Sequence, residues 1–344
     1  MSDLSPAPLT PLLTTALAAR SDLLARLAAE DTDCYRLFHG SVEGFPGLTI
    51  DRYGDLLLIQ TFHSAVDGAQ VGEIRRFYTE RPEFAGLDTL YNDRSGGNSR
   101  ITNVLGETDQ EIAQKPRIAK EMGISYRFQG RHAGQDPWLF LDLRAGRRRI
   151  MAEAAGKSVL NLFAYTCGVG LAAAKGGARF VVNVDFAESS LKVGRENAKL
   201  NDLPTRPRCV QSDVFPALRQ LAGLGQPPVV RGKRLPPFPK LEPQQFDLVF
   251  LDPPRYAKSP FGVVDLIHDY PALLKPAVLA TAEGGTLICC NNVAQVSREV
   301  WQDQIERCAR KAGRPARELE WIAPEEDFPS FDGQHPLKIA LLRL

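Results

Sequence analysis

The sequence predicts an α/β fold, a mainly parallel sheet with helices on both faces, preceded by a small α+β domain. From residue 155 onward, apolar strand candidates alternate with helical stretches across glycine-bearing turns, which is typical of a parallel sheet. Between residues 31 and 130, short β-rich runs are punctuated by Gly and Pro, which indicates strands joined by tight turns. A chain of 344 residues is long enough for both domains.

The composition excludes several classes of protein. The net charge is only +1, so any affinity for RNA would have to come from local patches. The longest apolar runs are shorter than the ~20 residues of a membrane span, and the N-terminus lacks the basic start of a secretory signal. The six cysteines include no C-x-x-C pair and no histidine at metal-ligand spacing. We therefore expect a cytoplasmic protein with reduced thiols, no membrane contact and no metal.

The first expected element is an N-terminal amphipathic helix within residues 1–30, because Leu and Ala recur at helical spacing from residue 8. The small α+β domain, residues 31–130, contains one helical stretch, GAQVGEIRRFYTE. Residues 131–344 form the larger domain. Its expected strands are KSVLNLFAY, ARFVVNVD, RCVQSD, FDLVFLD, GTLICCN and LKIALLRL.

One segment interrupts this alternation. Residues 226–245, QPPVVRGKRLPPFPKLEPQQ, hold six prolines and four basic residues, so they form neither a helix nor a central strand. We interpret the segment as a solvated insertion loop. An RNA-contacting arm is the alternative.

A glycine-bearing turn after the first strand of the larger domain indicates a ligand site. The strand leads into Gly168-x-Gly170-x-x-Ala173 and then into a helix. Glycine lets the backbone turn sharply and approach a ligand, and the helix start offers free N–H groups. The pattern fits a dinucleotide or S-adenosylmethionine (SAM), and it also fits a plain packing turn.

Two acidic residues end the next strands. Asp185 follows Gly168 by 17 residues and ends FVVNVD, where a carboxylate accepts hydrogen bonds from ribose hydroxyls. Asp213 ends CVQSD, where it could reach an adenine amine. Either residue could instead cap the helix that follows it.

The most specific motif is FDLVFLDPPRYAKS, residues 246–259. A buried strand delivers Asp252, Pro253 and Pro254, which form a stiff turn with outward-pointing carbonyl groups. Rigid acceptors beside a methyl donor suit a planar base or amine that must be held in line for transfer. A dehydrogenase has no evident use for this turn, so the motif favours SAM over a dinucleotide. A plain turn after a strand is the alternative.

These motifs together resemble those of the class I SAM-dependent methyltransferases, within them the group that modifies bacterial 23S ribosomal RNA at cytosine C5 or guanine N7. The segments that carry the resemblance are LNLFAYTCGVG, VVNVD, QSDVF, FDLVFLDPPRYAKS and GGTLICCNN, with GFPGLTIDRYGDLLLIQ, LYNDRSG and FLDLRAGRR upstream. They extend over most of residues 34–344. The resemblance implies a Rossmann-like domain with a mostly parallel seven-stranded sheet, its last strand antiparallel, and SAM across the strand tips.

The chain departs from that group in two places. Cys167 stands where relatives typically carry glycine, which puts the local backbone conformation in question. The sequence also shows no counterpart of the N-terminal RNA-binding PUA module of the cytosine-C5 relatives. We therefore expect RNA affinity to come from elsewhere in the chain.

The motifs and the resemblance define a set of expected site residues. Asp252, Pro253 and Pro254 hold the base, and Arg255, Tyr256 and Lys258 contact the RNA substrate by phosphate pairing and base stacking. The basic cluster 147–149 either holds phosphates or forms a solvated helix face. The expected SAM contacts are Arg144, Phe163, Tyr165, Thr166, Gly168, Gly170, Asp185, Asp213 and Asp252.

The stretch GGTLICCNNVAQ separates two kinds of chemistry. Methylation of cytosine C5 requires a thiolate to add at C6 first, whereas guanine N7 has its own lone pair. Counted from Gly284, the place of the cysteine in the cytosine-C5 relatives is occupied by Asn292, and Cys289 and Cys290 lie inside the strand. We interpret both cysteines as small core residues. Asn291 and Asn292, as in the guanine-N7 relatives, are the expected contacts to the base.

The leading interpretation is direct, non-covalent methyl transfer to guanine N7 in large-subunit ribosomal RNA, free or in a pre-ribosomal particle. Three alternatives stay open. They are a cytosine-C5 enzyme that uses Cys290, a protein or small-molecule N-methyltransferase, and a non-catalytic RNA-binding or assembly factor.

Overall fold

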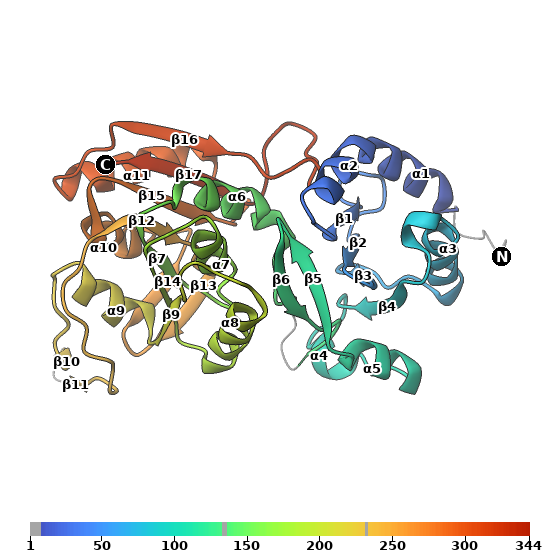
Figure 1. Ribbon diagram of the computed structural model, residues 1–344, viewed down its shortest axis with the longest axis horizontal. Coiled ribbons are helices and arrows are strands. Elements are labelled where there is room, and N and C mark those ends of the chain that lie inside the picture. Colours follow the sequence, from blue (N-terminus) through green and yellow to red (C-terminus); the bar gives the residue numbers. More distant parts are fainter. Residues whose placement is uncertain (1–7, 133–135, 231–232) are drawn as a thin grey trace. The chain divides into compact units, whose positions relative to one another are not determined.

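The computed structural model describes residues 8–132, 136–230 and 233–344, and the chain forms two compact units. The first comprises Met1–Leu141 and Glu325–Gly333, and the second comprises Asp142–Pro324 and Gln334–Leu344 (Figure 1). These limits differ from the expected boundary at residue 130. Leu139 still belongs to the first unit, where its carbonyl accepts a hydrogen bond from the Tyr53 hydroxyl at 3.0 Å.

The return of Glu325–Gly333 to the first unit was not expected from the sequence. The buried Asp327 explains it, because its carboxylate accepts the backbone N–H of Arg36 at 3.0 Å and its carbonyl accepts the Arg20 guanidinium at 3.3 Å. The ring of Phe328 lies 4.6 Å from the Arg36 guanidinium carbon. The segment is therefore held by buried polar contacts that sequence periodicity does not report.

The N-terminal segment forms two helices, α1 (Thr10–Ala19) and α2 (Ser21–Ala29), where one was expected; residues 1–7 of that expectation lie outside the described residues. The chain leaves helical geometry at Arg20, with φ −101° and ψ 0°. The guanidinium of Arg20 is buried and pairs with Glu43, and it donates to the Arg36 carbonyl at 2.9 Å. The expected apolar face is confirmed, since Leu13, Leu23 and Leu27 are buried in the core of the first unit.

The first unit is an α+β structure around a four-stranded sheet in the order β1-β2-β3-β4. The expected helix in GAQVGEIRRFYTE is confirmed and begins with a capping box between Asp67 and Gln70. That helix connects β3 to the parallel β4, while the other neighbours are antiparallel. The elements are β1 (Cys34–His39), β2 (Leu48–Tyr53), β3 (Leu56–Thr61), α3 (Gly68–Thr79), η1 (Pro82–Phe84), β4 (Asp88–Asp93), α4 (Ser99–Thr102), α5 (Glu107–Gln114) and the hairpin β5 (Arg117–Glu121) and β6 (Ile124–Phe128).

The second unit contains the expected mostly parallel seven-stranded sheet, in the order β16-β17-β15-β12-β7-β8-β9. The expected antiparallel last strand is confirmed, because β17 runs against both β15 and β16. All six expected strands are present. Among the seven strands of this sheet, β16 is the one that the sequence pattern missed, since it is a half-exposed edge strand with two glutamates. The strands are β7 (Ser158–Leu162), β8 (Phe180–Asp185), β9 (Arg208–Gln211), β12 (Phe246–Leu251), β15 (Thr281–Asn291), β16 (Glu318–Ile322) and β17 (Lys338–Arg343).

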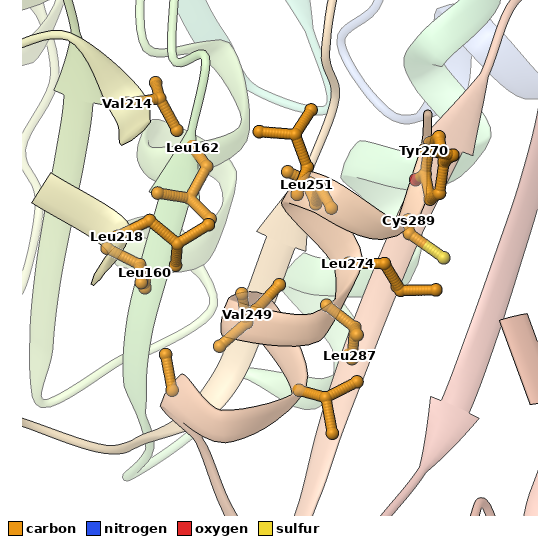
Figure 2. Packing of buried hydrophobic residues seen from close by; sticks show 14 of the residues in the cluster. Leu160, Leu162, Val214, Leu218, Val249, Leu251, Tyr270, Leu274, Leu287 and Cys289 are labelled. Atoms are coloured by element: carbon orange, nitrogen blue, oxygen red, sulfur yellow. The ribbon is translucent and has the colours of Figure 1, made fainter. Parts of the chain in front are cut away.

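Helices cover both faces of this sheet, as expected. On one face, α9 (Val214–Leu221), α10 (Pro271–Ala280) and α11 (Arg298–Lys311) form the larger core with alternate strand residues, and Figure 2 shows Leu274 of α10 near Leu287. The other face carries α6 (Arg144–Glu153), α7 (Gly168–Lys175) and α8 (Glu188–Leu200). The 3-10 helix η2 (Leu141–Leu143) includes Leu141 of the first unit and the first two residues of the second. The second unit therefore has three layers, with the carboxyl ends of the parallel strands along one edge.

The proline-rich insertion forms no part of the main sheet. Its only regular structure in the described residues is a pair of two-residue strands, β10 (Val229–Val230) and β11 (Lys233–Arg234); residues 231 and 232 lie outside them. The second half is anchored by Gln220, whose amide donates to the Pro239 carbonyl at 3.0 Å. The ring of Phe238 packs edge-on against Phe261, between β13 (Tyr256–Ser259) and β14 (Gly262–Asp265). An RNA-contacting role for this loop stays a prediction.

Within the described residues, none of the helices combines the length and apolar character needed to cross a membrane.

Gly170 generates a first prediction about stability. A Cβ at this position would lie 2.1 Å from Asn183 Oδ1, and that oxygen already accepts a hydrogen bond from Asn161 at 2.8 Å. We expect Gly170→Ala to lower the free energy of unfolding by about 1–3 kcal/mol, as in other overpacked sites. Denaturant unfolding measures this.

Gly72→Ala is the matched control, because its Cβ would meet only the end of Arg76 at 3.8 Å. Replacing this mid-helix glycine is expected to leave stability unchanged or raise it by about 0.5–1 kcal/mol. Equal stability of Gly170→Ala and the wild type would contradict the packing argument.

Candidate active site at the strand ends

The loop between β7 and α7 holds three non-glycine residues in the left-handed backbone region. Phe163, Tyr165 and Cys167 have φ values of 58°, 49° and 66°. Each such residue costs on the order of 1 kcal/mol, and such strain gathers at functional sites. Cys167 thus adopts the conformation that favours glycine, and this answers the question that its replacement of glycine raised.

Asp185 at the end of β8 fixes this loop. One carboxylate oxygen accepts the backbone N–H of Tyr165 at 2.8 Å, and the other accepts that of Ala187 at 2.8 Å. Burial raises the pKa of Asp185, and the backbone hydrogen bonds oppose that rise. A carboxylate has about four lone-pair positions, so the N–H groups of Tyr165, Ala187 and Phe186 leave at least one of them to a ligand. The side chain is therefore equipped to accept ribose hydroxyls while it holds the loop.

Asp213 caps the next helix. Its carboxylate accepts the backbone N–H of Phe215 at 2.9 Å at the start of α9. This is the helix-cap alternative from the sequence, and it engages one carboxylate oxygen. A contact to adenine through the other oxygen stays a prediction.

The two glycines of the turn have different roles. Gly170 is buried in α7, where the absence of a side chain permits close packing on Asn183, and its contact with SAM stays a prediction. Gly168 is the first residue of α7 and is half-buried. The preceding Cys167 makes no side-chain capping hydrogen bond, and the first turn carries no acidic residue. This helix start is thus suited to a carboxylate, such as that of the methionine part of SAM.

Asp252 ends β12 and lies beside three groups. Burial raises its pKa to about 7, and the charge of Asp142 adds to that rise. A hydrogen bond from the Cys290 thiol and the charge of Arg147 act in the opposite direction. The carboxyl group therefore exchanges its proton near neutral pH. Pro253 is buried and Pro254 is exposed in the turn that follows.

Both Cys289 and Cys290 are fully buried, as our interpretation predicted, but only one of them lies beside Asp252. Cys289 is a core residue on the α10 face, as expected. Cys290 points to the opposite face, where its thiol donates to Asp252. It is fully buried, and its pKa is raised well above the ordinary value by burial first and then by the Asp252 charge. Strand alternation predicted that the two thiols diverge, but it could not say which one meets Asp252.

The two asparagines do not form a pair facing the site. Asn291 is fully buried, and its amide shapes the turn after β15: Oδ1 accepts the Val293 N–H at 2.9 Å and Nδ2 donates to the Leu266 carbonyl at 3.4 Å. Asn292 is exposed. Contact with a base thus stays a prediction for Asn292, and Asn291 acts through the backbone.

The basic residues also divide. Arg144 and Arg147 are buried in α6, and Arg149 forms ion pairs with Glu153 and Glu320. The 147–149 cluster is therefore neither a free phosphate-binding surface nor a wholly solvated face. Arg255, Tyr256 and Lys258, by contrast, are exposed directly after the Asp-Pro-Pro turn.

The parallel sheet brings the strand-end residues to one edge. The Ser212 N–H donates to the Asp185 carbonyl at 2.9 Å, which joins the ends of β8 and β9, and the Asp252 N–H approaches the Leu162 carbonyl at 3.5 Å. A carboxylate with a spare lone-pair position, a strained loop and a helix start without a side-chain cap fit a nucleoside with a carboxylate tail, as in SAM. No cluster of three metal-binding side chains exists among the residues that the structure describes.

Asp252 generates a prediction with a defined sign. Because its folded pKa of about 7 exceeds the ordinary value near 3.9, the folded state holds a proton between about pH 4 and 7 that the unfolded state has lost. This group therefore costs stability as the pH rises through that window. We expect Asp252→Asn to be more stable than the wild type by about 1–3 kcal/mol at pH 8, and equally stable at pH 4.

Asp247 on the same strand provides a control of opposite sign. Hydrogen bonds from Ser158 first, then an ion pair with Arg179, lower its pKa. Its stabilising contribution is present at neutral pH and lost in acid. Thermal unfolding should show Asp247→Asn destabilised throughout pH 4 to 8, with the difference from the wild type shrinking only as the pH falls below about 4. A pH-independent effect of Asp252→Asn would contradict the raised pKa.

Known proteins resemble this chain over nearly its whole length. A family model described as S-adenosylmethionine-dependent methyltransferase matches residues 36–343. Ribosomal RNA large subunit methyltransferase I of Aeromonas hydrophila is 31% identical over 299 residues, which cover 86% of this chain and 70% of the relative. The ribosomal RNA large subunit methyltransferase of Deinococcus radiodurans is 31% identical over 310 residues, which cover 89% and 71%.

Solved structures confirm the Rossmann-like class I methyltransferase fold. A Streptococcus mutans protein assigned as a SAM-dependent methyltransferase superposes with a TM-score of 0.75 at 24% identity, over 100% of this chain and 83% of that one. A protein assigned as a methyltransferase and solved with SAH has the same TM-score and identity over 98% and 82%. With the family match, the strand-end geometry leads to one conclusion: the chain belongs to the SAM-dependent methyltransferases, and SAM is its cofactor.

Proposed function

We propose that this enzyme methylates a base of large-subunit ribosomal RNA in the cytoplasm, and that the acceptor atom is guanine N7. The two relatives at 31% identity are named ribosomal RNA large subunit methyltransferases, which supports the RNA class. The proposal of guanine N7 as the acceptor atom rests on the burial and protonation of the Cys290 thiol. The thiol beside Asp252 is fully buried, bound to a carboxylate and disfavoured as a thiolate, so an acceptor with its own lone pair fits best.

The chain's own residues would position and stabilise the reactants. SAM supplies an electrophilic methyl group on a sulfonium when bound. Asp185 and the 163–167 loop would hold its adenosine part, and the start of α7 would face its carboxylate. Asp252 and the proline turn would hold the base, with Tyr256 stacking and with Arg255 and Lys258 pairing with phosphates.

Asp252 also suits the charge that this reaction creates. Methylation of guanine N7 leaves a positive charge on the base, and an ionised carboxylate beside it stabilises that charge. Because the pKa of Asp252 is about 7, the ionised fraction grows as the pH rises through neutrality. The rate of methyl transfer should therefore increase over the same range.

One observation favours a second candidate, methylation of cytosine C5 through Cys290. The thiol contacts Asp252 at the strand end, and a carboxylate with a pKa of about 7 is a suitable acceptor for its proton. In this case Cys290 must become accessible when RNA binds. The two candidates predict different products and different effects of removing the thiol.

Nucleoside mass spectrometry of ribosomal RNA, from the host with and without the gene, tests the proposal. The expected result is the loss of one 7-methylguanosine from large-subunit RNA, restored by the wild-type gene. Loss of 5-methylcytidine would overturn the acceptor atom, and unchanged ribosomal RNA would point to protein or small-molecule substrates.

Complementation with variants separates the roles. Cys290→Ala should restore the modification under the leading proposal and fail under the cytosine-C5 alternative. Asn292→Ala should reduce it by about tenfold or more if this exposed amide contacts the base. Val300→Ala, a change at an exposed position on α11, is the control.

Asp185 generates a prediction about the cofactor alone. Asp185→Asn replaces one acceptor by an NH2 group that faces a backbone N–H of Tyr165 or Ala187. We expect SAM affinity measured by calorimetry to fall by about 10- to 100-fold. Asp202→Asn, an exposed change, should leave the affinity unchanged. Equal binding by Asp185→Asn would remove this residue from the proposed cofactor site.

A further inference from the structure

We propose that Cys167 and Cys209 form a peroxide-sensitive thiol pair whose oxidation to a disulfide weakens SAM binding. Their sulfur atoms lie 3.9 Å apart, with Cys167 in the strained 163–167 loop and Cys209 on β9, the edge strand of the main sheet. This inference concerns the cofactor loop and does not depend on which base the enzyme methylates.

The surroundings of Cys167 are shaped around its sulfur. Ala164 and Leu191 form a small apolar cluster with Cys167, and Cys209 packs against this cluster. A Cβ on Gly194 of α8 would lie 2.5 Å from the Cys167 sulfur, so a side chain at that position would collide with it. The Cys167 thiol is thus held beside Cys209 of β9, among Ala164, Leu191 and Gly194.

The two thiols differ in the way that a reactive pair requires. Cys209 is the more accessible, only half-buried, and its pKa falls to about 7, through the hydrogen bond from Cys167 first and then through Arg195. Cys167 is buried, and its pKa is raised well above the ordinary value. Cys209 is therefore the attacking thiolate and Cys167 the resolving thiol.

The chemistry balances with hydrogen peroxide as the oxidant. The Cys209 thiolate attacks one peroxide oxygen, the O–O bond breaks, and the departing hydroxide is protonated to water, which leaves a sulfenic acid. The Cys167 sulfur then attacks the Cys209 sulfur, the S–O bond breaks, and the hydroxide leaves as water with the proton of Cys167. Two thiols and one peroxide thus give one disulfide and two waters. A dithiol reductant reduces the Cys167–Cys209 disulfide back to two thiols by thiol–disulfide exchange.

We expect disulfide formation to displace the loop. The sulfurs have to approach from 3.9 Å to about 2.05 Å. Cys167 is tied through its N–H to the Ala164 carbonyl at 2.7 Å and precedes the first residue of α7. Two residues earlier, Tyr165 is bound to Asp185. A displacement of Cys167 would therefore disturb both Asp185, the proposed acceptor of the ribose hydroxyls, and the start of α7, which suits the carboxylate of SAM.

The test uses the purified full chain and hydrogen peroxide, with SAM affinity measured by calorimetry and the cysteine linkage by peptide mass spectrometry. We expect a Cys167–Cys209 linkage, a SAM dissociation constant raised by about tenfold or more, and recovery with dithiothreitol. By reciprocity, saturating SAM should shift the dithiol–disulfide equilibrium of this pair, measured in a defined redox buffer, toward the dithiol by the same factor.

Variants make the result specific. Cys209→Ser should bind SAM as the reduced wild type does and keep that affinity after peroxide. Cys308→Ser, which removes a cysteine of α11 outside this cluster, should stay as sensitive as the wild type. The proposal is overturned if peroxide leaves SAM affinity unchanged, if Cys209→Ser loses affinity like the wild type, or if oxidation yields no Cys167–Cys209 linkage.

Discussion

The carboxylate of Asp185 is the constraint on which the cofactor side of this enzyme depends. The hydrogen bonds that it accepts from the N–H groups of Tyr165 and Ala187 tie the loop after β7 to the turn after β8. A loop with three left-handed non-glycine residues does not keep that shape on local preference alone, because each costs on the order of 1 kcal/mol. The N–H groups of the loop thus stabilise the buried charge of Asp185, and that carboxylate in turn orders the loop. The same contacts position the start of α7, which follows the loop directly.

Burial raises the pKa of both Asp185 and Asp252, but Asp252 lacks the backbone hydrogen bonds that oppose this rise at Asp185. The carboxyl group of Asp252 lies beside Asp142 and accepts only a weak thiol hydrogen bond, so burial and repulsion outweigh the charge of Arg147. A carboxyl group destabilised in this way favours a positively charged partner, and it is kept at the end of a rigid strand by the core beneath β12. The carboxylate of Asp185 accepts its hydrogen bonds within the folded chain. The carboxyl group of Asp252 would instead be stabilised by a positively charged ligand or product.

The strand and helix pattern made the fold predictable, because buried parallel strands read as apolar runs that glycine turns separate. The pattern missed β16, whose glutamates suit an edge, and the break at Arg20, which depends on a partner 23 residues away, Glu43. The positions of Asp185 and Asp252 at strand ends were predictable, because the end of an apolar strand fixes them, while their part in a site stays a prediction. Beyond a strand end, the direction of a side chain depends on the turn that follows. The spacing of Asn291 and Asn292 therefore could not show that the Asn291 side chain is hydrogen-bonded to the backbone.

The side chain of Cys167 stands in the loop at a position whose backbone conformation favours glycine. A cysteine with a φ of 66° is less favourable than glycine by on the order of 1 kcal/mol, so its side chain must be accommodated by something nearby. Gly194 supplies the space, and Ala164 and Leu191 supply apolar contact. Glycine therefore stands on the helix that packs against the loop, and the side chain stands in the loop itself. The sulfur of Cys167 therefore lies between the 163–167 loop and the edge strand β9. Through its contact with Cys209, a small displacement of β9 would shift the loop backbone that is hydrogen-bonded to Asp185.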